Sequence, residues 1–201
     1  LPGLTTDQLA TLGTDQIVAL TTAQVKALTT DQVAALATDQ FAALTSLQVG
    51  ALTSAQLAAV ETEDLVVLDS KQIRAIGNTA LTGLTTDQIS TMGSDQIASL
   101  TSVQINVLST AQIAALTSEQ AGALLSSQAL GLSSKQIAAM DTEDVAALSS
   151  SAINALSALQ VKGLSTDQII ALTTEQASTL AASVASAMTT AQLSAIATDD
   201  L

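Results

Sequence analysis

The sequence predicts an all-α solenoid of very short capped helices, with one helix in each eight-residue repeat. Three observations support this fold. An apolar residue recurs at every eighth position from Leu4 to Ile196, without an insertion or deletion. A Thr or Ser occupies a second position in 22 of 25 repeats, and a Gln occupies a third position in 19 of them. The Ala, Gln and Leu that fill much of each repeat favour helix over strand.

The start of each helix is predicted from the polar residues of the octad, whose positions we label a to h with Leu4 at a. A Thr or Ser at position c is a typical helix N-cap, and an Asp at d then lies in the first turn, where the helix dipole favours negative charge. The predicted caps include Thr6, Thr14, Thr22, Thr30 and Thr38. Where Thr also occupies b, a capping box between b and the Gln at e is a competing register.

Two other structures fit the pattern less well. In one continuous helix, eight residues advance about 800°, so the apolar stripe would rotate by about 80° in each octad and no fixed face would form. In a strand, the apolar positions a and f are separated by five and then three residues, which breaks the two-residue alternation. A β-solenoid with two octads in each rung is retained as the alternative.

Such short helices have to be stabilised by stacking. A helix of about two turns does not survive alone in water. Its f and a residues share one face, and the small residues at h let neighbouring helices approach closely. Stacked octads would therefore bury a continuous aliphatic strip, as in an α-solenoid. We expect two octads in each superhelical turn, because a helical hairpin is the smallest unit that closes.

The Gln at position e has a specific role in this fold. A primary amide both donates and accepts hydrogen bonds without carrying charge. We predict that it bridges stacked turns and satisfies backbone groups that short helices leave bare. The predicted ladder contains Gln8, Gln16, Gln24, Gln32, Gln40, Gln48 and Gln56. Three octads have Asp at this position, which accepts hydrogen bonds but has no amide donor: Asp64, Asp144 and Asp200. Three others have no polar side chain there, which predicts local weak points: Ala80, Ala152 and Val184.

Residues 1–201 are expected to form a single continuous array of about 25 octads. A longer period of 80 residues lies above the octad, since residues 4–22 match residues 84–102 and glycines recur at Gly3, Gly83 and Gly163. Neither end shows the atypical polar repeat that normally caps a solenoid. We therefore expect either a segment of a longer array or ends that stack on other subunits.

Composition argues against several classes of function. The formal net charge is −13, from 18 acidic and five basic residues, which disfavours nucleic-acid partners. No apolar run reaches the roughly 18 residues of a membrane span, so no membrane insertion is expected. The chain has no Cys and no His, and its acidic residues recur in one slot instead of forming a unique constellation. We expect neither enzymatic activity nor a cofactor.

Two acidic clusters lie 80 residues apart and are the weak candidates for a calcium site. They contain Glu61, Glu63 and Asp64 in the first cluster and Asp141, Glu143 and Asp144 in the second. Carboxylate oxygens can bind Ca²⁺, but the spacing matches neither an EF-hand nor the Gly-rich nonapeptide calcium repeat. The favoured interpretation is a solvated acidic surface without a metal.

Two octads show the consensus clearly: residues 28–36 read Leu-Thr-Thr-Asp-Gln-Val-Ala-Ala-Leu and residues 108–116 read Leu-Ser-Thr-Ala-Gln-Ile-Ala-Ala-Leu. This pattern resembles octapeptide repeat tracts of long secreted or surface adhesin-like bacterial proteins. The resemblance implies an extracellular or cell-surface location and a role as a fibre, stalk or matrix component. End-to-end self-association into a homo-oligomer or filament is expected. An ice-binding surface, suggested by the recurring Thr, and a ligand-binding solenoid surface are the alternatives.

Overall fold

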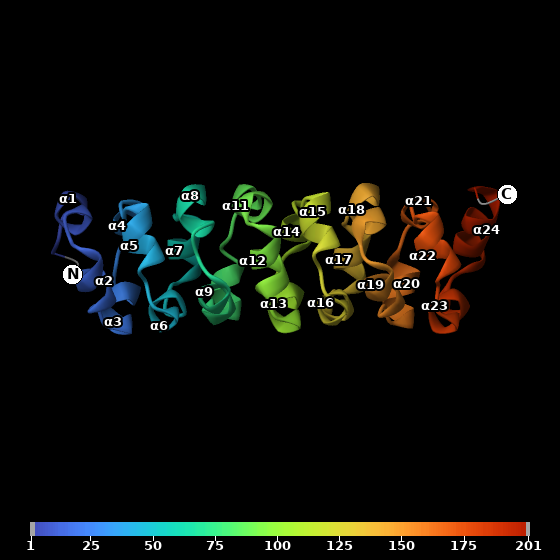
Figure 1. The fold of residues 1–201 in the computed structure, drawn as a ribbon, viewed down its shortest axis with the longest axis horizontal. Coiled ribbons are helices and arrows are strands. Elements are labelled where there is room, and N and C mark those ends of the chain that lie inside the picture. The colour runs from blue at the N-terminus through green and yellow to red at the C-terminus, as the bar shows by residue number, and fades with distance from the viewer. Residues whose placement is uncertain (1–2, 200–201) are drawn as a thin grey trace. The chain divides into compact units, whose positions relative to one another are not determined.

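All regular secondary structure in residues 3–199, the part of the chain that the structure describes, is helical. This computed structural model contains 24 helices in that range and no strand (Figure 1). The helices are four to six residues long except the last, which has ten. The all-α prediction is therefore confirmed, and the β-solenoid alternative is excluded.

The chain divides into two compact units, residues Leu1–Leu100 and Thr101–Leu201. The first unit contains α1 (Thr6–Ala10), α2 (Thr14–Val18), α3 (Thr22–Lys26), α4 (Thr30–Ala34), α5 (Thr38–Ala42), α6 (Ser46–Val49), α7 (Ser54–Ala58), α8 (Thr62–Leu65), α9 (Ser70–Ala75), α10 (Asn78–Leu81), α11 (Thr86–Thr91) and α12 (Ser94–Ser99). The second unit contains α13 (Ser102–Val107), α14 (Thr110–Ala114), α15 (Ser118–Gly122), α16 (Ser126–Gly131), α17 (Ser134–Ala138), α18 (Thr142–Ala147), α19 (Ser150–Asn154), α20 (Ala158–Gly163), α21 (Thr166–Ile170), α22 (Thr174–Ser178), α23 (Ala182–Ala187) and α24 (Thr190–Asp199).

Every helix from α1 to α23 ends in a tight turn closed by the apolar residue at position a. In α4, the N–H of Leu36 donates to the Val33 carbonyl at 3.2 Å, which pulls the chain out of α-helical geometry. The next residue at b is extended, with φ −73° and ψ 164° at Thr29 before α4. No residue in the described range has positive φ, so these helices end without a left-handed glycine.

Successive turns of the solenoid bring together residues that are between three and four octads apart. Within each unit, helices pack on the helix three places later, as α6 does on α9 and α15 on α18. Hydrogen bonds between turns join residues 25 to 31 positions apart. The expectation of two octads per turn is therefore wrong, because each octad redirects the chain by only about a third of a turn and a hairpin needs half a turn.

This turn length gives the 80-residue sequence period a geometric meaning. Three steps of 25 to 31 residues span 75 to 93 residues. An 80-residue block therefore has about the length of three turns.

The interior of each unit is an aliphatic strip formed by positions f and a. Most f residues are fully buried, as at Ile97 and Ile105, and most a residues are nearly so, as at Leu100, whereas Leu193 at f near the C-terminal end is 46% exposed. Each such side chain contributes about 1.5–3 kcal/mol by leaving water. The predicted apolar face is confirmed, and Phe41 is its one aromatic member.

Candidate functional site

Where position e is Gln, hydrogen bonds at the start of the helix join positions b and e. In α4, Thr29 Oγ1 accepts from the Gln32 N–H at 3.2 Å, and Gln32 Oε1 accepts from the Thr29 N–H at 2.9 Å. Where b has no hydroxyl, the Gln oxygen still accepts from the b N–H, at distances of 2.8 to 2.9 Å. This occurs at Gly13, Ala37, Gly93 and Leu125.

The predicted caps at position c are therefore wrong. Thr6, Thr14, Thr22, Thr30 and Thr38 are the first residues of their helices, and the residue before each of them is the N-cap. The competing register between b and e is the one that forms, since only there does the Gln at e lie three residues beyond the cap and complete the capping box.

Position c is small and polar for a different reason, which is contact with position h of the next turn. Ser99, at h, donates from Oγ to Ser70 Oγ at 2.8 Å, across 29 residues. A Cβ added to Gly83, also at h, would lie 2.0 Å from the Ser54 carbonyl oxygen. The recurrence of small residues at both positions therefore reflects the close approach of successive turns.

The Gln side chains at e form the predicted ladder between turns. Gln40 Nε2 donates to the carbonyls of Leu9 at 3.1 Å and Leu12 at 2.6 Å, which lie 31 and 28 residues earlier. Gln32 donates to the Leu4 carbonyl, and Gln48 and Gln56 repeat the pattern of Gln40. The same donation to earlier carbonyls is made by Gln72, Gln88, Gln96, Gln136, Gln160, Gln168, Gln176 and Gln192. These bonds join successive turns.

The first three predicted ladder residues make the capping bond through Oε1 but, within the described residues, no bond to another turn through Nε2. Gln8, Gln16 and Gln24 accept through Oε1 from the N–H of Thr5, Gly13 and Thr21 at 2.8 to 2.9 Å. Their side chains are exposed.

Asp144 shows what an acid does in a ladder position. Its Oδ1 accepts from Ser118 Oγ at 2.9 Å, whereas its Oδ2 is buried and has no hydrogen-bond partner. The residue is only 3% exposed, and this burial raises the pKa of its carboxyl above the usual value. Asp64 is buried in the equivalent place in α8, and Asp200 lies outside the described residues.

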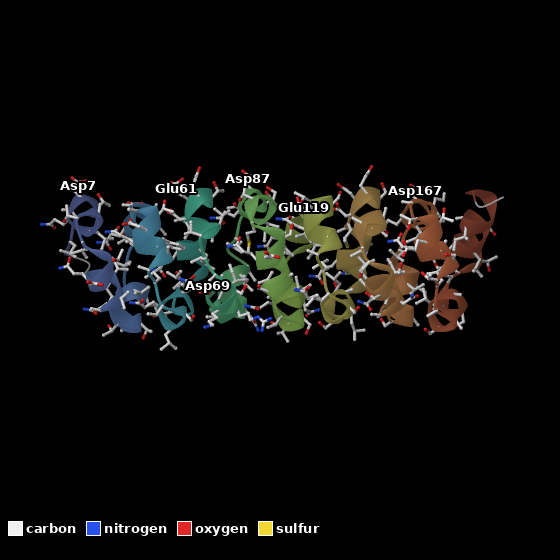
Figure 2. The ribbon with its side chains drawn as sticks, viewed as in Figure 1. Asp7, Glu61, Asp69, Asp87, Glu119 and Asp167 are labelled. Carbon is white, nitrogen blue, oxygen red and sulfur yellow. The ribbon has the colours of Figure 1, made fainter. Side chains whose placement is uncertain are left out.

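The acidic clusters are divided between the surface and the interior. Glu61, Glu63, Asp141 and Glu143 are exposed, while their neighbours Asp64 and Asp144 are buried. Figure 2 shows Asp7, Glu61 and Asp87 at the outer surface of the first unit. Within residues 3–199, no three acidic groups come together in a way that could hold a metal ion. The geometry is that of a solvated acidic surface over an aliphatic interior.

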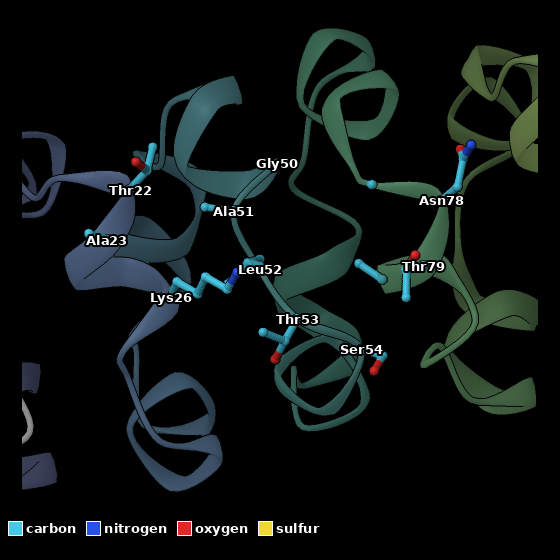
Figure 3. Close-up of a pocket in the computed structure, with 12 residues that line it drawn as sticks. Thr22, Ala23, Lys26, Gly50, Ala51, Leu52, Thr53, Ser54, Asn78 and Thr79 are labelled. Atoms are coloured by element: carbon cyan, nitrogen blue, oxygen red, sulfur yellow. The ribbon is translucent and has the colours of Figure 1, made fainter.

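A groove of about 560 Å³ lies in the first unit, beside α10 (Figure 3). It is lined by residues of three successive turns, among them Lys26, Gly50, Leu52, Thr53, Gly77 and Ala80. Lys26 extends across it toward Leu52 (Figure 3). The sequence predicts a weak point of the ladder at Ala80 but not the groove. The feature that could have indicated the groove is the small residue Gly50, one turn earlier.

No helix among the described residues is long and apolar enough to cross a membrane. The comparison with curated proteins finds no match. The family model described as the ALTTAQ repeat matches residues 16–46, 57–94, 65–108, 91–126 and 137–174. Its six letters stand unchanged at residues 19–24, where they run through position e of the third octad. These matches cover more than half of the sequence, so the chain belongs to the ALTTAQ repeat family.

Proposed function

We propose that this chain is a non-catalytic structural segment of an extracellular or cell-surface bacterial fibre, stalk or matrix protein, and that its turns also join end to end between copies. The observation that carries the proposal is the glutamine ladder. The same two-carbonyl bond to the preceding turn recurs throughout both units, for example at Gln40 and Gln168. The connection is therefore modular and gains length by simple addition.

Exposed ladder amides would also support association between copies. Gln8, Gln16 and Gln24 already hold their oxygens in capping bonds, so their amide nitrogens are oriented by the helix they cap. Another copy's carbonyls at positions f and a would accept from them as carbonyls do inside each unit. Such a head-to-tail contact does not close on itself and builds open filaments. The net charge of −13 opposes side-by-side aggregation.

The chemistry of the side chains supports a non-catalytic role. The chain has no His or Cys to act as general base or nucleophile. Its exposed carboxylates recur in the first turn of the helices, as at Asp7, Asp15 and Asp31. There they interact favourably with the helix dipole, which accounts for their positions without a reaction.

Sedimentation velocity over a range of protein concentration, with electron microscopy of the same samples, tests the proposal. We expect concentration-dependent growth into thin filaments. The triple variant Gln8→Glu, Gln16→Glu, Gln24→Glu keeps the oxygen that caps each helix but loses the amide donor, so it should fold and stay monomeric. The matched control Asp15→Asn, Asp31→Asn, Asp39→Asn changes exposed side residues and should still assemble. A wild-type chain that stays monomeric at high concentration contradicts end-to-end association.

A further inference from the structure

One edge of the second unit carries exposed aliphatic side chains on successive turns. They are Val103 on α13, Leu130 on α16 and Leu159 on α20, which are 57, 56 and 70% exposed. Helix α13 packs on α16, and Gln160 Nε2 donates to the Leu130 carbonyl at 3.2 Å, which places the adjoining Leu159 on the turn next to Leu130. Figure 1 shows α13, α16 and α20 along the lower side of this unit. We call this row the aliphatic edge, and its contiguity distinguishes it from single exposed apolar residues, which are common.

Both basic residues of the second unit border the aliphatic edge. Its sequence contains Lys135 on α17 and Lys162 on α20 and no other Lys or Arg, and both side chains are exposed. Lys162 follows Leu159 by three residues on one helix, so the two side chains share a face. Lys135 lies one turn earlier, since α17 packs on α20. The aliphatic edge is therefore bordered by positive charge in a chain whose net charge is −13.

The opposite side of the same unit has the complementary charge. Glu119 on α15, Glu143 on α18 and Asp167 on α21 are exposed in the first turns of their helices. Helix α18 packs on α15 and on α21, so these carboxylates lie on successive turns, along the upper side of the unit in Figure 1. Ile170, also on α21, is 44% exposed among them. This acidic edge therefore presents both carboxylates and an aliphatic side chain.

We propose that the aliphatic edge is a lateral docking surface for the acidic edge of a second copy of this chain. Charge complementarity identifies this occupant, because Lys135 and Lys162 of one copy pair with carboxylates such as Glu143 of the other. Ile170 of the second copy packs against the row that contains Leu159. The two copies also share one spacing between turns, so each turn on one edge meets a turn on the other.

The net charge opposes lateral contact elsewhere on the molecule, so a contact forms where the sign of the surface charge reverses. This contact is heterologous, because an aliphatic edge meets an acidic edge, and each pair of copies retains one free edge of each kind. Three aliphatic side chains form a small interface, so the contact between two single chains is weak and is populated at millimolar concentration. It uses none of the amides of Gln8, Gln16 and Gln24, so it does not depend on end-to-end association.

Paramagnetic relaxation between two copies, measured by NMR, tests the proposal. Both copies carry Gln8→Glu, Gln16→Glu and Gln24→Glu, which removes the donors of the end-to-end contact. One copy carries a nitroxide on Thr166→Cys, at an exposed position of α21, and the other copy is ¹⁵N-labelled. The nitroxide site is unique because the chain has no Cys.

At millimolar concentration we expect broadening of the Val103, Leu130 and Leu159 amides on the ¹⁵N-labelled copy, and weaker broadening at higher salt. The double variant Leu130→Gln, Leu159→Gln on that copy changes exposed positions, so it should fold, and it should reduce the broadening of Val103 by about fivefold or more. An absence of broadening, an even spread over exposed amides, or an unchanged effect on Val103 in the double variant would overturn the proposal.

Charge reversal tests the pairing of the two edges. Lys135→Glu with Lys162→Glu on the ¹⁵N-labelled copy should reduce the broadening by about fivefold or more. Glu119→Lys with Glu143→Lys on the spin-labelled copy should then restore it, because the charges of the two edges are exchanged. A mixture of the two reversed copies that shows no restored broadening would overturn the proposal.

The matched control makes the same change in net charge on the first unit. Lys26→Glu with Lys71→Glu replaces two exposed lysines that lie outside the aliphatic edge, so it should leave the broadening intact. Equal losses from the two lysine pairs would overturn the proposal, because the contact would then depend on net charge alone.

Discussion

The octads of α21 and α18 both form a short helix but differ in their hydrogen bonds to the preceding turn. Gln168 in α21 accepts from the Ser165 N–H at 2.8 Å and donates to Ile137 and Met140 at 2.9 and 2.7 Å. Asp144 in α18 has no donor when ionised and leaves one buried oxygen unpaired. The helix forms in both places, because stacking and the aliphatic strip remain. What changes is the polar connection between turns, which depends on a single side chain.

The largest expected effect comes from deleting a buried ladder amide. Gln168→Ala would leave the Ser165 N–H and two interior carbonyls with lost bonds, at a cost of about 3 kcal/mol, because unsatisfied buried groups cost about 1–3 kcal/mol each. Gln16→Ala, at an exposed position, should cost less than about 1 kcal/mol, because only a solvent-accessible capping bond is lost. Urea denaturation followed by circular dichroism measures both, and equal losses would contradict the ladder's role.

Asp144 is expected to make stability depend on pH. Burial raises its folded-state pKa above the unfolded value of about 4. Its contribution to stability is therefore fully present below about pH 4 and is lost as pH rises through the folded pKa. The charges that act on it are the carboxylates of Asp141, which precedes α18, and Glu143 on α18. The helices packed on α18 also carry carboxylates, Glu119 on α15 and Asp167 on α21. None of them compensates its negative charge.

Asp144→Gln should thus stabilise the chain by about 2 kcal/mol at pH 7 through restored ladder bonds, and by less at pH 4. Thermal unfolding at both pH values measures the difference. Glu143→Gln is the control with the opposite sign, since hydrogen bonds from its own backbone N–H and from the Thr142 hydroxyl lower its pKa. A gain from Asp144→Gln that is the same at both pH values would show that Asp144 does not titrate in this range.

The contrast between these octads also shows which features the sequence could predict. The f and a strip follows from local helix geometry, so the burial of Ile97 and Leu100 was predictable. The bridging role of Gln followed from the chemistry of its amide. The number of octads per turn was not predictable, because it depends on small rotations at each a and b residue. The groove at Ala80 could not be predicted without the number of octads per turn, since only a turn of this length places Gly50 beside Gly77.

The N-cap was predicted at position c but lies at position b, for a physical reason. Two substitutions with small effects on stability test that reason. Two neighbouring positions both favour hydroxyls, one to cap the helix and one to fit between turns. Ser165 Oγ, at b, accepts from the Gln168 N–H at 3.0 Å, whereas Thr166, at c, is the first helical residue of α21. Ser165→Ala should therefore cost about 1 kcal/mol, the usual value of an N-cap.

Thr166→Ala should change stability by less than about 0.5 kcal/mol, because Ala is a good helix former and no capping bond is lost. Urea denaturation of the two single variants, measured side by side, decides between the registers. A larger loss at Thr166 would place the cap at c and would leave the Gln oxygen at e without its role in the capping box. Since that oxygen orients the amide whose nitrogen reaches the previous turn, the cap and the ladder depend on the same side chain and would have to be revised together.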